Sequence, residues 1–355
     1  MKAILTTPPK GGVKIAEIKL REEKGLRLRT LRTGICGTDK EIVEGRLNFA
    51  RTETGNELVL GHEALAIVED SGDSNEFKKG DIVVPMVRRP GNCRMCRLGR
   101  QDYCEDGDFV EAGIRGKDGF MREEFYDKEK FLVKVNDKSI ADLAVLTEPM
   151  KNVMKMVEIF NFQRNRIPTY CDDSTMNCKN LYVFGTGTEG LLISAVFKTM
   201  GLNVIAVNRH PPDDTVAKFL EINDINYLDT SKESISSHSK KYKMDFAIDA
   251  VGSMDIMRDI SLNISNNGIS ILFGTSGQMP SSNYEFLGNL VDKNIAVIGS
   301  VDGAKVHYAE AIEFISNYGR KMSLDRLITG IYKPEETGIF TNKEKGEIKK
   351  VIQWS

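Results

Sequence analysis

The stretch Leu181-Tyr182-Val183-Phe184-Gly185-Thr186-Gly187-Thr188-Glu189-Gly190 joins an apolar run to a glycine-rich turn. Helical spacing follows over Leu191–Met200, and a second apolar run covers Asn203–Val207. In such a strand–helix–strand unit the three glycines allow a tight turn, close approach of the backbone to a pyrophosphate, and close packing of the helix on the strand. The amino end of the helix favours anionic phosphates. The stretch therefore predicts a dinucleotide-binding unit; the alternative is a glycine-rich turn in an α/β protein with another ligand.

Further apolar runs follow toward the C-terminus, at Asp245–Asp249, Ile269–Phe273 and Ile295–Ile298. Helical patterns at Met254–Ile264 and Tyr284–Val291 alternate with them. Continuous apolar strands that alternate with helices predict a parallel, doubly wound sheet. We therefore expect a Rossmann domain over residues 181–302.

Cofactor contacts are expected where these strands end. The candidates are Gly185, Gly187, Thr188, Glu189, Gly190, Asn208, Arg209, His210, Phe273, Gly274, Thr275, Ser300, Val301 and Asp302. The second strand ends at Asn208-Arg209-His210, without an acid that would bind the ribose 2′-hydroxyl. Because Arg209, with its neighbours, suits a 2′-phosphate, we predict that NADP is accepted, with NAD as an alternative. The competing interpretation makes Arg209 a solvated surface cation.

The first part of the chain is rich in short strands. Alternating runs separated by turns predict strands at Lys2–Thr6, Val13–Ile18, Leu26–Leu31, Leu58–Glu69, Ile82–Val84, Met121–Tyr126 and Phe131–Val135. Helical spacing then covers Ala141–Phe160, and 346–352 reads as a strand that returns to the first domain. We expect a second domain that combines residues 1–180 and 303–355.

The bulk properties indicate neither a nucleic-acid nor a membrane partner. The formal net charge of the 355 residues is −2. No apolar run reaches the roughly 18 residues that a membrane helix needs. Met1 opens directly into a strand pattern, so no signal peptide is expected and the predicted location is the cytoplasm.

A cysteine and a histidine form one candidate metal site. Cys36, with His62 further along the chain in Gly61-His62-Glu63, offers the donors that zinc accepts. The hydroxyl of Thr38 is placed to pass protons from a substrate oxygen at the metal. The competing interpretations are that His62 is an ordinary strand residue and that Thr38 only caps a short helix.

Three further cysteines crowd into a lobe of residues 88–119. Cys93, Cys96 and Cys104 have a spacing typical of metal sites. The lobe lacks periodicity and is rich in Gly, Asp and Arg, which suggests that something other than apolar burial holds it together. Cys171 and Cys178 have no metal partners nearby and are expected to be buried or surface thiols.

In the order of its motifs the chain resembles the zinc-dependent medium-chain dehydrogenases, over nearly its whole length. The motifs are Cys36-Gly37-Thr38-Asp39, Gly61-His62-Glu63, the cysteine lobe, Thr147-Glu148-Pro149 and the dinucleotide-binding unit. Within that superfamily it is most similar to the archaeal glucose dehydrogenases. The closer signs are Val87-Arg88-Arg89, Glu111-Ala112-Gly113-Ile114, Asp118-Gly119-Phe120-Met121-Arg122-Glu123, Cys171-Asp172-Asp173, Val207-Asn208-Arg209 and Gly346-Glu347-Ile348-Lys349. The resemblance implies an α/β plus β architecture, with a GroES-like catalytic domain beside the Rossmann domain.

The resemblance implies a catalytic zinc held by Cys36 and His62. Glu63 and Glu148 would be the remaining ligands, directly or through water. Asp39 is interpreted as orienting the His62 imidazole; the alternative is an acid that caps a helix.

The implied reaction oxidises C1 of an aldose, D-glucose or D-galactose, to the aldonolactone by hydride transfer. Thr38 would be the first proton relay. The resemblance places Thr38, Glu111, Glu148, Asn152 and Asp302 around the sugar. The alternatives make Glu111 a solvated loop acid, Asn152 a helix-surface residue and Asp302 a turn former.

Two alternative functions are kept beside the glucose dehydrogenase hypothesis, and an oligomeric state is expected. One rival is a polyol or secondary-alcohol dehydrogenase on the same scaffold, and the other is a non-catalytic NADPH-binding protein. The resemblance also implies a homotetramer.

The cysteine lobe departs from the fuller family pattern, in which four cysteines hold a structural zinc. Only three cysteines are present here, and Pro90 stands near the position of the first. The fourth ligand is then Asp106, Asp108 or water, or else the site is weak or empty.

Overall fold

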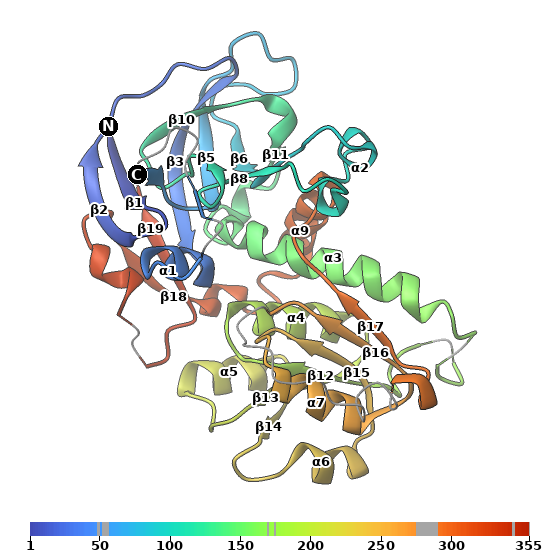
Figure 1. Ribbon diagram of the computed structural model, residues 1–355. Helices are drawn as coiled ribbons and strands as arrows, with labels where there is room; N and C mark the ends of the chain where they lie inside the picture. Colours follow the sequence, from blue (N-terminus) through green and yellow to red (C-terminus); the bar gives the residue numbers. More distant parts are fainter. Residues whose placement is uncertain are drawn as a thin grey trace. The chain divides into compact units, whose positions relative to one another are not determined.

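Helix α3 (Thr147–Arg164) contains the first boundary between the two units of the protein. The computed structural model describes residues 1–47, 50–51, 57–168, 170–173, 175–274, 290–342 and 345–354. Its first unit combines Met1–Lys151 with Asp302–Ser355, and its second is Asn152–Val301 (Figure 1). The predicted boundary at residue 180 lies after the helix, whereas the division lies inside it. The reason is that Phe160, in the second half of α3, packs edge-on against Phe197 and Phe246 of the second unit.

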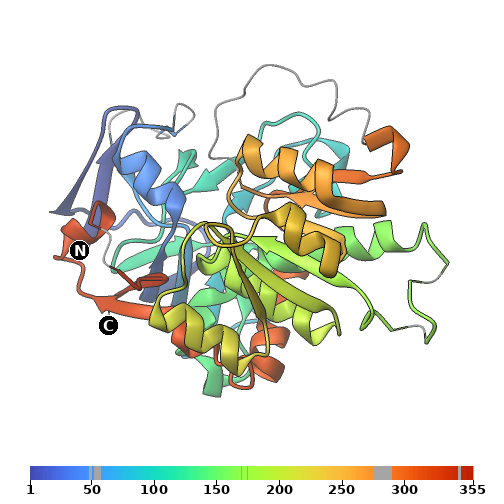
Figure 2. The ribbon, with the colours of Figure 1, turned by 90° about the horizontal axis from the view of Figure 1, so that it is seen from below.

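Six parallel strands form the sheet of the second unit, in the order β14-β13-β12-β15-β16-β17. They are β12 (Asn180–Phe184), β13 (Asn203–Asn208), β14 (Asn226–Asp229), β15 (Met244–Asp249), β16 (Ile264–Leu272) and β17 (Ala296–Gly299). The helices between them are α4 (Thr188–Thr199), α5 (Asp214–Ile222), α6 (Ile235–Lys241) and α7 (Met254–Asn263), and they cover both faces (Figure 2). The predicted doubly wound sheet is therefore confirmed.

Burial on both faces explains why these strands read as continuous apolar runs. Tyr182 and Val183 in β12 are fully buried, as are Val204 and Ala206 in β13. The strand order reverses at β12, where β13 lies on one side and β15 on the other, and ligands bind at such a switch point. Most of the helix predicted over Tyr284–Val291 lies outside the described residues.

Antiparallel sheets dominate the first unit. One has the order β2-β1-β4, from β1 (Lys2–Thr7), β2 (Gly11–Glu17) and β4 (Leu58–Val59). The larger sheet has the order β11-β6-β5-β3-β19-β18, with β10 also paired to β3. Its strands are β3 (Leu26–Ile35), β5 (Glu63–Asp70), β6 (Ile82–Pro85), β10 (Glu124–Asp127), β11 (Leu132–Lys134), β18 (Ile328–Tyr332) and β19 (Lys349–Gln353). The C-terminal strand β19 pairs antiparallel with β3, so the predicted return of the tail to the first domain is confirmed.

Short elements complete the first unit. The helices are α1 (Gly37–Val43), α2 (Arg94–Arg97) and α9 (Lys305–Tyr318). A small sheet consists of β7 (Arg88–Arg89), β8 (Val110–Ala112) and β9 (Gly116–Lys117). The 3₁₀ turns are at Gln101–Tyr103, Glu129–Phe131, Lys138–Ile140, Ala144–Leu146, Leu324–Leu327 and Thr337–Phe340. Among the described helices, none combines the length and the apolar character needed to cross a bilayer.

Cys171 and Cys178 form a disulfide, which corrects the expectation of two separate thiols. Their Cα atoms lie 5.9 Å apart, within the range that a disulfide needs. The polar connector between α3 and β12 folds back on itself there, and the Cys178 N–H points to the Cys171 sulfur. Sequence spacing alone did not show that turn.

Candidate active site

Cys36, His62 and Glu63 lie together in the first unit, although Cys36 is remote from the other two in sequence. Strand β3 ends one residue before Cys36 and pairs antiparallel with β5, which begins at Glu63, so Gly34 lies opposite Glu63. The candidate ligand atoms of the three side chains all lie within 4.8 Å of one another. Strand pairing thus creates a cluster of one sulfur, one imidazole and one carboxylate.

Asp39 contacts the His62 imidazole and also caps helix α1. Its Oδ1 lies 3.3 Å from His62 Nδ1, and both side chains are buried. Burial alone would lower the pKa of His62, but the Asp39 carboxylate and the Cys36 sulfur raise it well above its ordinary value. A contact at Nδ1 leaves Nε2 as the nitrogen that a metal would bind in place of a proton. The Oδ2 atom accepts the Cys36 N–H at 2.9 Å, so the orienting role and the capping role coexist.

Lys349 is a functional partner that the sequence did not reveal. Its Nζ lies 2.7 Å from both carboxylate oxygens of Glu63, and both side chains are buried. Burial raises the pKa of Glu63, while Lys349 opposes that rise. The pairing arises because β5 and β19 flank β3 in the sheet. Direct coordination of a metal by Glu63 would compete with this ion pair.

Glu148 lies in the first turn of α3, outside the three-residue cluster. Its Oε1 is 3.2 Å from Lys151 Nζ, and the side chain is buried. Its charge contributes to the raised pKa of Glu63, so the two carboxylates are close enough to repel each other. The structure therefore brings Glu148 near the cluster but not into contact with Cys36 and His62.

Thr38 lies inside α1 and does not cap it, because the helix begins at Gly37 with Cys36 as its N-cap. This corrects the interpretation of Thr38 as a helix cap. Its Oγ1 lies 3.8 Å from the Cys36 sulfur. The hydroxyl is thus beside the candidate metal site, as a proton relay requires.

The donor set of the cluster fits a catalytic zinc. A thiolate, an imidazole and a carboxylate are the ligands of catalytic zinc sites, which keep one position open. His62 Nδ1 is buried and directed toward a carboxylate, the usual arrangement of a metal-bound histidine. We infer that Cys36 and His62 would hold the ion, with Glu63 or Glu148 completing the set.

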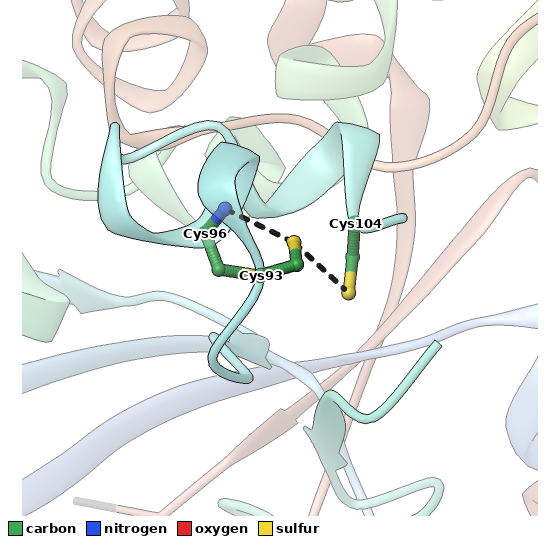
Figure 3. Close-up of side chains that lie close together, drawn as sticks. All are labelled: Cys93, Cys96 and Cys104. Atoms are coloured by element: carbon green, nitrogen blue, oxygen red, sulfur yellow. Dashed lines mark hydrogen bonds between the residues drawn. The ribbon is translucent and has the colours of Figure 1, made fainter. Parts of the chain in front are cut away.

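The lobe cysteines form a second cluster (Figure 3). The sulfurs of Cys93, Cys96 and Cys104 all lie within 4.8 Å of one another, and those of Cys93 and Cys104 are 3.9 Å apart. Backbone N–H groups of Cys96 and Glu105 lower the pKa of the Cys93 thiol to about 7, whereas burial raises that of Cys96 to about 12. A bound cation would favour the thiolate of both.

Asp108 is better placed than Asp106 to be the fourth ligand of the lobe. Its Oδ1 lies 3.5 Å from the Cys104 sulfur, and its Oδ2 accepts the Asn92 N–H at 3.1 Å. Asp106 is exposed and makes no such contact with the described residues. The lobe therefore offers three sulfurs and one carboxylate oxygen.

We expect Asp108→Ala to weaken zinc binding in the lobe, because it removes the carboxylate that lies beside the Cys104 sulfur. Zinc per chain, measured by elemental analysis after competition with a chelator, should fall toward that of Cys96→Ser. The matched control is Asp106→Ala, which should keep the wild-type zinc content. Equal losses in both aspartate variants would contradict the assignment of Asp108.

Glu111 and Asp302 both form ion pairs in the first unit, and Asp302 is buried whereas Glu111 is partly buried. Glu111, on β8, pairs with Arg88 at 2.9 Å, and Asp302 pairs with Lys151 at 2.5 Å. Burial would raise the pKa of Asp302, but Lys151 and Arg88 lower it below the ordinary value. The interpretation of Glu111 as a solvated loop acid is therefore wrong. Asp302 has φ +55°, in the left-handed region, and it forms an ion pair as well.

Asn152 lies at the start of the second unit and contacts the glycine-turn helix. Its Nδ2 donates to Glu189 Oε1 at 3.1 Å. The side chain is buried, which excludes the alternative of a helix-surface residue, and its Oδ1 has no hydrogen-bond partner among the described residues. Within the second unit, Asn152 therefore lies against Glu189, which is a candidate cofactor-binding residue.

The glycine turn has the geometry that close phosphate approach requires. Gly185 has φ +104°, and a Cβ on Gly190 would lie 2.0 Å from the Gly185 carbonyl oxygen. Gly187 is the N-cap of α4, whose first residue is Thr188. A Cβ on Gly187 would meet no described atom within 4 Å, so its backbone is open to a ligand. These features fit a pyrophosphate at the amino end of α4.

Asn208 ends β13 beside that turn, and Arg209 and His210 follow it. Asn208 Nδ2 donates to Thr186 Oγ1 at 2.7 Å, and Asn208 Oδ1 accepts the Arg209 N–H. The Arg209 and His210 side chains are exposed, and no described acid pairs with the Arg209 guanidinium. Thr186, which the sequence did not single out, thus ties the turn to the strand end.

Asp249 supports the strand-end candidates further along the sheet. Its Oδ1 accepts N–H bonds from Val251 and Gly252, and its carbonyl accepts those of Phe273 and Gly274. The sequence did not identify Asp249 as a candidate. The signal that could have done so is its position at the end of β15.

The other strand-end candidates differ in exposure. Ser300 is buried, with no described hydrogen-bond partner for its hydroxyl, whereas Val301 is exposed. The predicted contact at Thr275 lies outside the described residues.

Two family models together match most of the chain. Residues 22–137 match the alcohol dehydrogenase GroES-like domain, and residues 141–354 match the glucose dehydrogenase C-terminus. The glucose 1-dehydrogenase of Thermoplasma acidophilum is 42% identical, with 99% of each chain covered. Glucose 1-dehydrogenase 2 of Caldivirga maquilingensis is 40% identical, with 100% of each covered.

A solved structure is similar over the same extent. Glucose dehydrogenase of Haloferax mediterranei, in complex with NADP, Zn and gluconolactone, aligns with a TM-score of 0.89 and 29% identity, covering 100% of this chain and 99% of that one. Three observations indicate the same family. They are the order of the metal-ligand, lobe and dinucleotide motifs, the two family-model matches, and the identity over the full length of the relatives. The chain belongs to the zinc-type medium-chain dehydrogenases, in the glucose dehydrogenase family.

Proposed function

We propose that the protein is a zinc-dependent glucose 1-dehydrogenase that oxidises C1 of an aldose and reduces NADP, with NAD as a second acceptor. The observation that carries the proposal is the cluster of partly buried Cys36 with buried His62 and Glu63, whose ligand atoms lie within 4.8 Å of one another. The relatives named glucose 1-dehydrogenase support the substrate class. Removal of a hydride and a proton from the C1–OH group gives the aldonolactone and NADPH.

The first unit would supply the metal, proton and sugar contacts. Bound zinc supplies Lewis acidity toward the sugar oxygen. Cys36 and His62 would hold it, and Asp39 keeps the imidazole in the required orientation. The Thr38 hydroxyl, 3.8 Å from the Cys36 sulfur, would take the proton of the C1 hydroxyl and pass it to solvent. Glu148, Glu111 and Asp302 offer acceptors for sugar hydroxyls, because carboxylates fix the direction of each O–H group.

The second unit would bind the nucleotide. Its glycine turn offers the backbone of Gly187 to the pyrophosphate, and Arg209 the charge for a 2′-phosphate. Phe273, Gly274, Ser300 and Val301 lie at strand ends where the nicotinamide half is expected. The NADP and zinc in the Haloferax enzyme support both cofactors.

An aldose panel tests the proposal. D-glucose, D-galactose, sorbitol, threonine and simple alcohols are assayed with NADP and NAD, before and after chelation and zinc restoration. We expect turnover of D-glucose that chelation abolishes and zinc restores. Preference for sorbitol or another secondary alcohol would make the protein a polyol or secondary-alcohol dehydrogenase. Nucleotide binding without any turnover would make it a non-catalytic NADPH-binding protein.

Cofactor preference is expected to depend on Arg209. Arg209→Ala should raise the KM for NADP by roughly ten- to hundredfold, since a hydrogen bond to a charged group contributes about 1.5–3 kcal/mol. The KM for NAD should change little, because NAD has no 2′-phosphate. Steady-state kinetics with both acceptors measures this. A marked NAD preference in the wild type that Arg209→Ala leaves unchanged would overturn the assignment.

We further propose a cytoplasmic homotetramer. The family resemblance supports the assembly, and the net charge of −2 gives no reason to expect a nucleic-acid or membrane partner. Light scattering on the zinc-loaded protein measures the mass directly; a monomeric mass at assay concentration would exclude the tetramer.

A further inference from the structure

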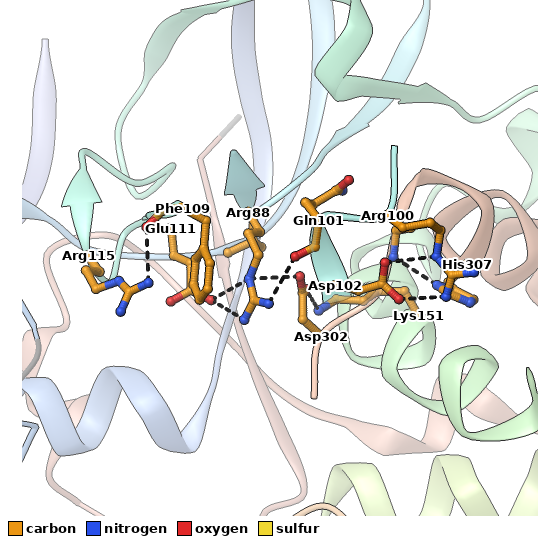
Figure 4. A network of polar contacts seen from close by, with 12 residues as sticks. Arg88, Arg100, Gln101, Asp102, Phe109, Glu111, Arg115, Lys151, Asp302 and His307 are labelled. Atoms are coloured by element: carbon orange, nitrogen blue, oxygen red, sulfur yellow. Dashed lines mark hydrogen bonds and ion pairs between the residues drawn. The ribbon is translucent and has the colours of Figure 1, made fainter. Parts of the chain in front are cut away.

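The guanidinium of Arg88 lies buried between two acids that come from separate parts of the first unit (Figure 4). Its Nε and Nη2 lie 3.1 and 2.9 Å from Glu111 Oε1. The same Nε lies 3.1 Å from Asp302 Oδ2. Glu111 is on β8 and Asp302 is far along the chain, after β17, so one side chain sets the relative position of both carboxylates.

Two further contacts hold Arg88 in place. Its guanidinium carbon lies 3.8 Å from the centroid of the Phe109 ring, and Nη1 donates to the Gln101 carbonyl oxygen at 3.4 Å. Arg115 lies over the same ring, at 4.1 Å (Figure 4). A planar group that is stacked on a ring and bonded along its edge has one orientation. Arg88 therefore acts as a rigid support for the acids it contacts.

Lys151 continues the row of charges toward the candidate metal site. Its Nζ lies 2.5 Å from Asp302 Oδ1 and 3.2 Å from Glu148 Oε1. Negative and positive groups alternate from Glu111 through Arg88, Asp302 and Lys151 to Glu148. All five side chains are at least largely buried, and the two cations keep the three carboxylates from repelling one another.

Stability alone does not account for such a row. Removing charges from water costs several kcal/mol per ion, and well-packed apolar side chains of similar volume are often at least as stabilising. The row also leaves acceptor capacity unused. Among the described residues, Glu111 Oε2 accepts no hydrogen bond, and Asp302 Oδ2 is buried without a well-aligned donor. A polyhydroxyl ligand supplies such donors.

We propose that Arg88 is a positioning residue for the sugar. It orients Glu111 and Asp302 so that each accepts a hydrogen bond from one particular hydroxyl, and in this way it determines which aldoses the site selects. The inference rests on the proposed function, because it concerns how that same site recognises its substrate. Sites built to bond a hydroxyl reject analogues that lack it, since the buried acceptor is left unpaired.

The test compares Arg88→Lys with Arg89→Lys in the zinc-loaded full-length protein. Arg89 is a matched control: it is equally buried, pairs with Asp127 at 2.6 Å and stacks on Phe131, but contacts neither Glu111 nor Asp302. Lysine keeps the charge and loses the planar fork. The substrates are D-glucose and its 2-deoxy, 3-deoxy and 6-deoxy analogues, with NADP as acceptor.

Wild type should discriminate against at least one deoxy analogue. Arg88→Lys should raise the KM for D-glucose by roughly ten- to hundredfold, because one hydrogen bond from a sugar hydroxyl to a charged carboxylate is lost. The KM for that analogue should stay almost unchanged, because the analogue lacks the hydroxyl. The KM for NADP should stay the same. Arg89→Lys should keep the wild-type ratio between the sugars, whatever it does to thermal stability.

Uniform losses on all sugars in Arg88→Lys would mean a purely structural role and overturn the inference. If Arg88→Lys fails to fold, Glu111→Gln is measured instead, because it leaves Arg88 in place. The inference requires that Glu111→Gln reduce the discrimination against a deoxy analogue. An unchanged ratio between the KM of that analogue and the KM of D-glucose also overturns the inference. Failure of the proposed function is separate, because it shows as absence of aldose oxidation in the wild type.

Discussion

Lys349→Met is expected to lower the free energy of unfolding by about 3–5 kcal/mol, the usual cost of removing one partner of a buried ion pair. Lys349 Nζ is the group that lies 2.7 Å from both Glu63 oxygens, and Glu63 is 1% exposed. Without Lys349 the buried carboxylate loses the cation that lies against both of its oxygens, and it must take up a proton or draw in water. Denaturant unfolding of the metal-free protein at neutral pH measures the loss.

A double-mutant cycle separates the pair from the packing of the lysine stem. Glu63→Gln combined with Lys349→Met removes both charges, so the double variant should be more stable than Lys349→Met alone. Additive losses would show that the two groups do not interact and would contradict the ion pair. Lys350→Met, one residue on in the same strand, is the matched control for the loss of a buried lysine that does not contact Glu63.

Asp39→Asn is expected to weaken zinc binding at Cys36 and His62 by about 10–100-fold, the usual effect of losing the partner of a metal-bound histidine. One side-chain oxygen must still accept the Cys36 N–H, as Oδ2 does now at 2.9 Å. The amide N–H₂ group then faces His62 Nδ1, which must become the acceptor. The proton moves to Nε2, the atom needed for the metal. Competition with a zinc chelator measures the affinity.

Asp213→Asn is the control for this change, because Asp213 also caps a helix, accepting the Val216 N–H at 3.0 Å, and pairs with no histidine in the described part of the chain. Asparagine is as good an N-cap as aspartate. Zinc affinity should therefore be unchanged in Asp213→Asn. If Asp39→Asn also keeps wild-type affinity, the contact between Asp39 and His62 does not orient the ligand.

Local patterns were sufficient for the parallel sheet of the second unit. The turn at Gly185–Gly190 lies between a strand and a helix in one short stretch, so periodicity and glycine spacing identify it without any long-range contact. The strands of the parallel sheet read as apolar runs because both faces are buried. Cys36 and His62 were paired from residue type and resemblance, and the β3–β5 ladder then brought them together.

The partners of the buried charges were decided by the tertiary structure. Lys349 is 286 residues from Glu63 in sequence, and only the strand order β5-β3-β19 makes them neighbours. The choice of Asp108 over Asp106, the Cys171–Cys178 disulfide and the row of charges through Arg88 depend in the same way on how loops fold back.

The physical reason is a difference in range. A helix, a strand or a glycine turn forms through groups a few residues apart, so its signal is a local period. A buried charge needs a counter-charge from whichever segment packs against it, and that segment is selected by the packing of the whole sheet. The residues that would bind zinc, nucleotide and sugar could therefore be predicted from the sequence. The side chains that hold these residues in place became evident only in the folded protein.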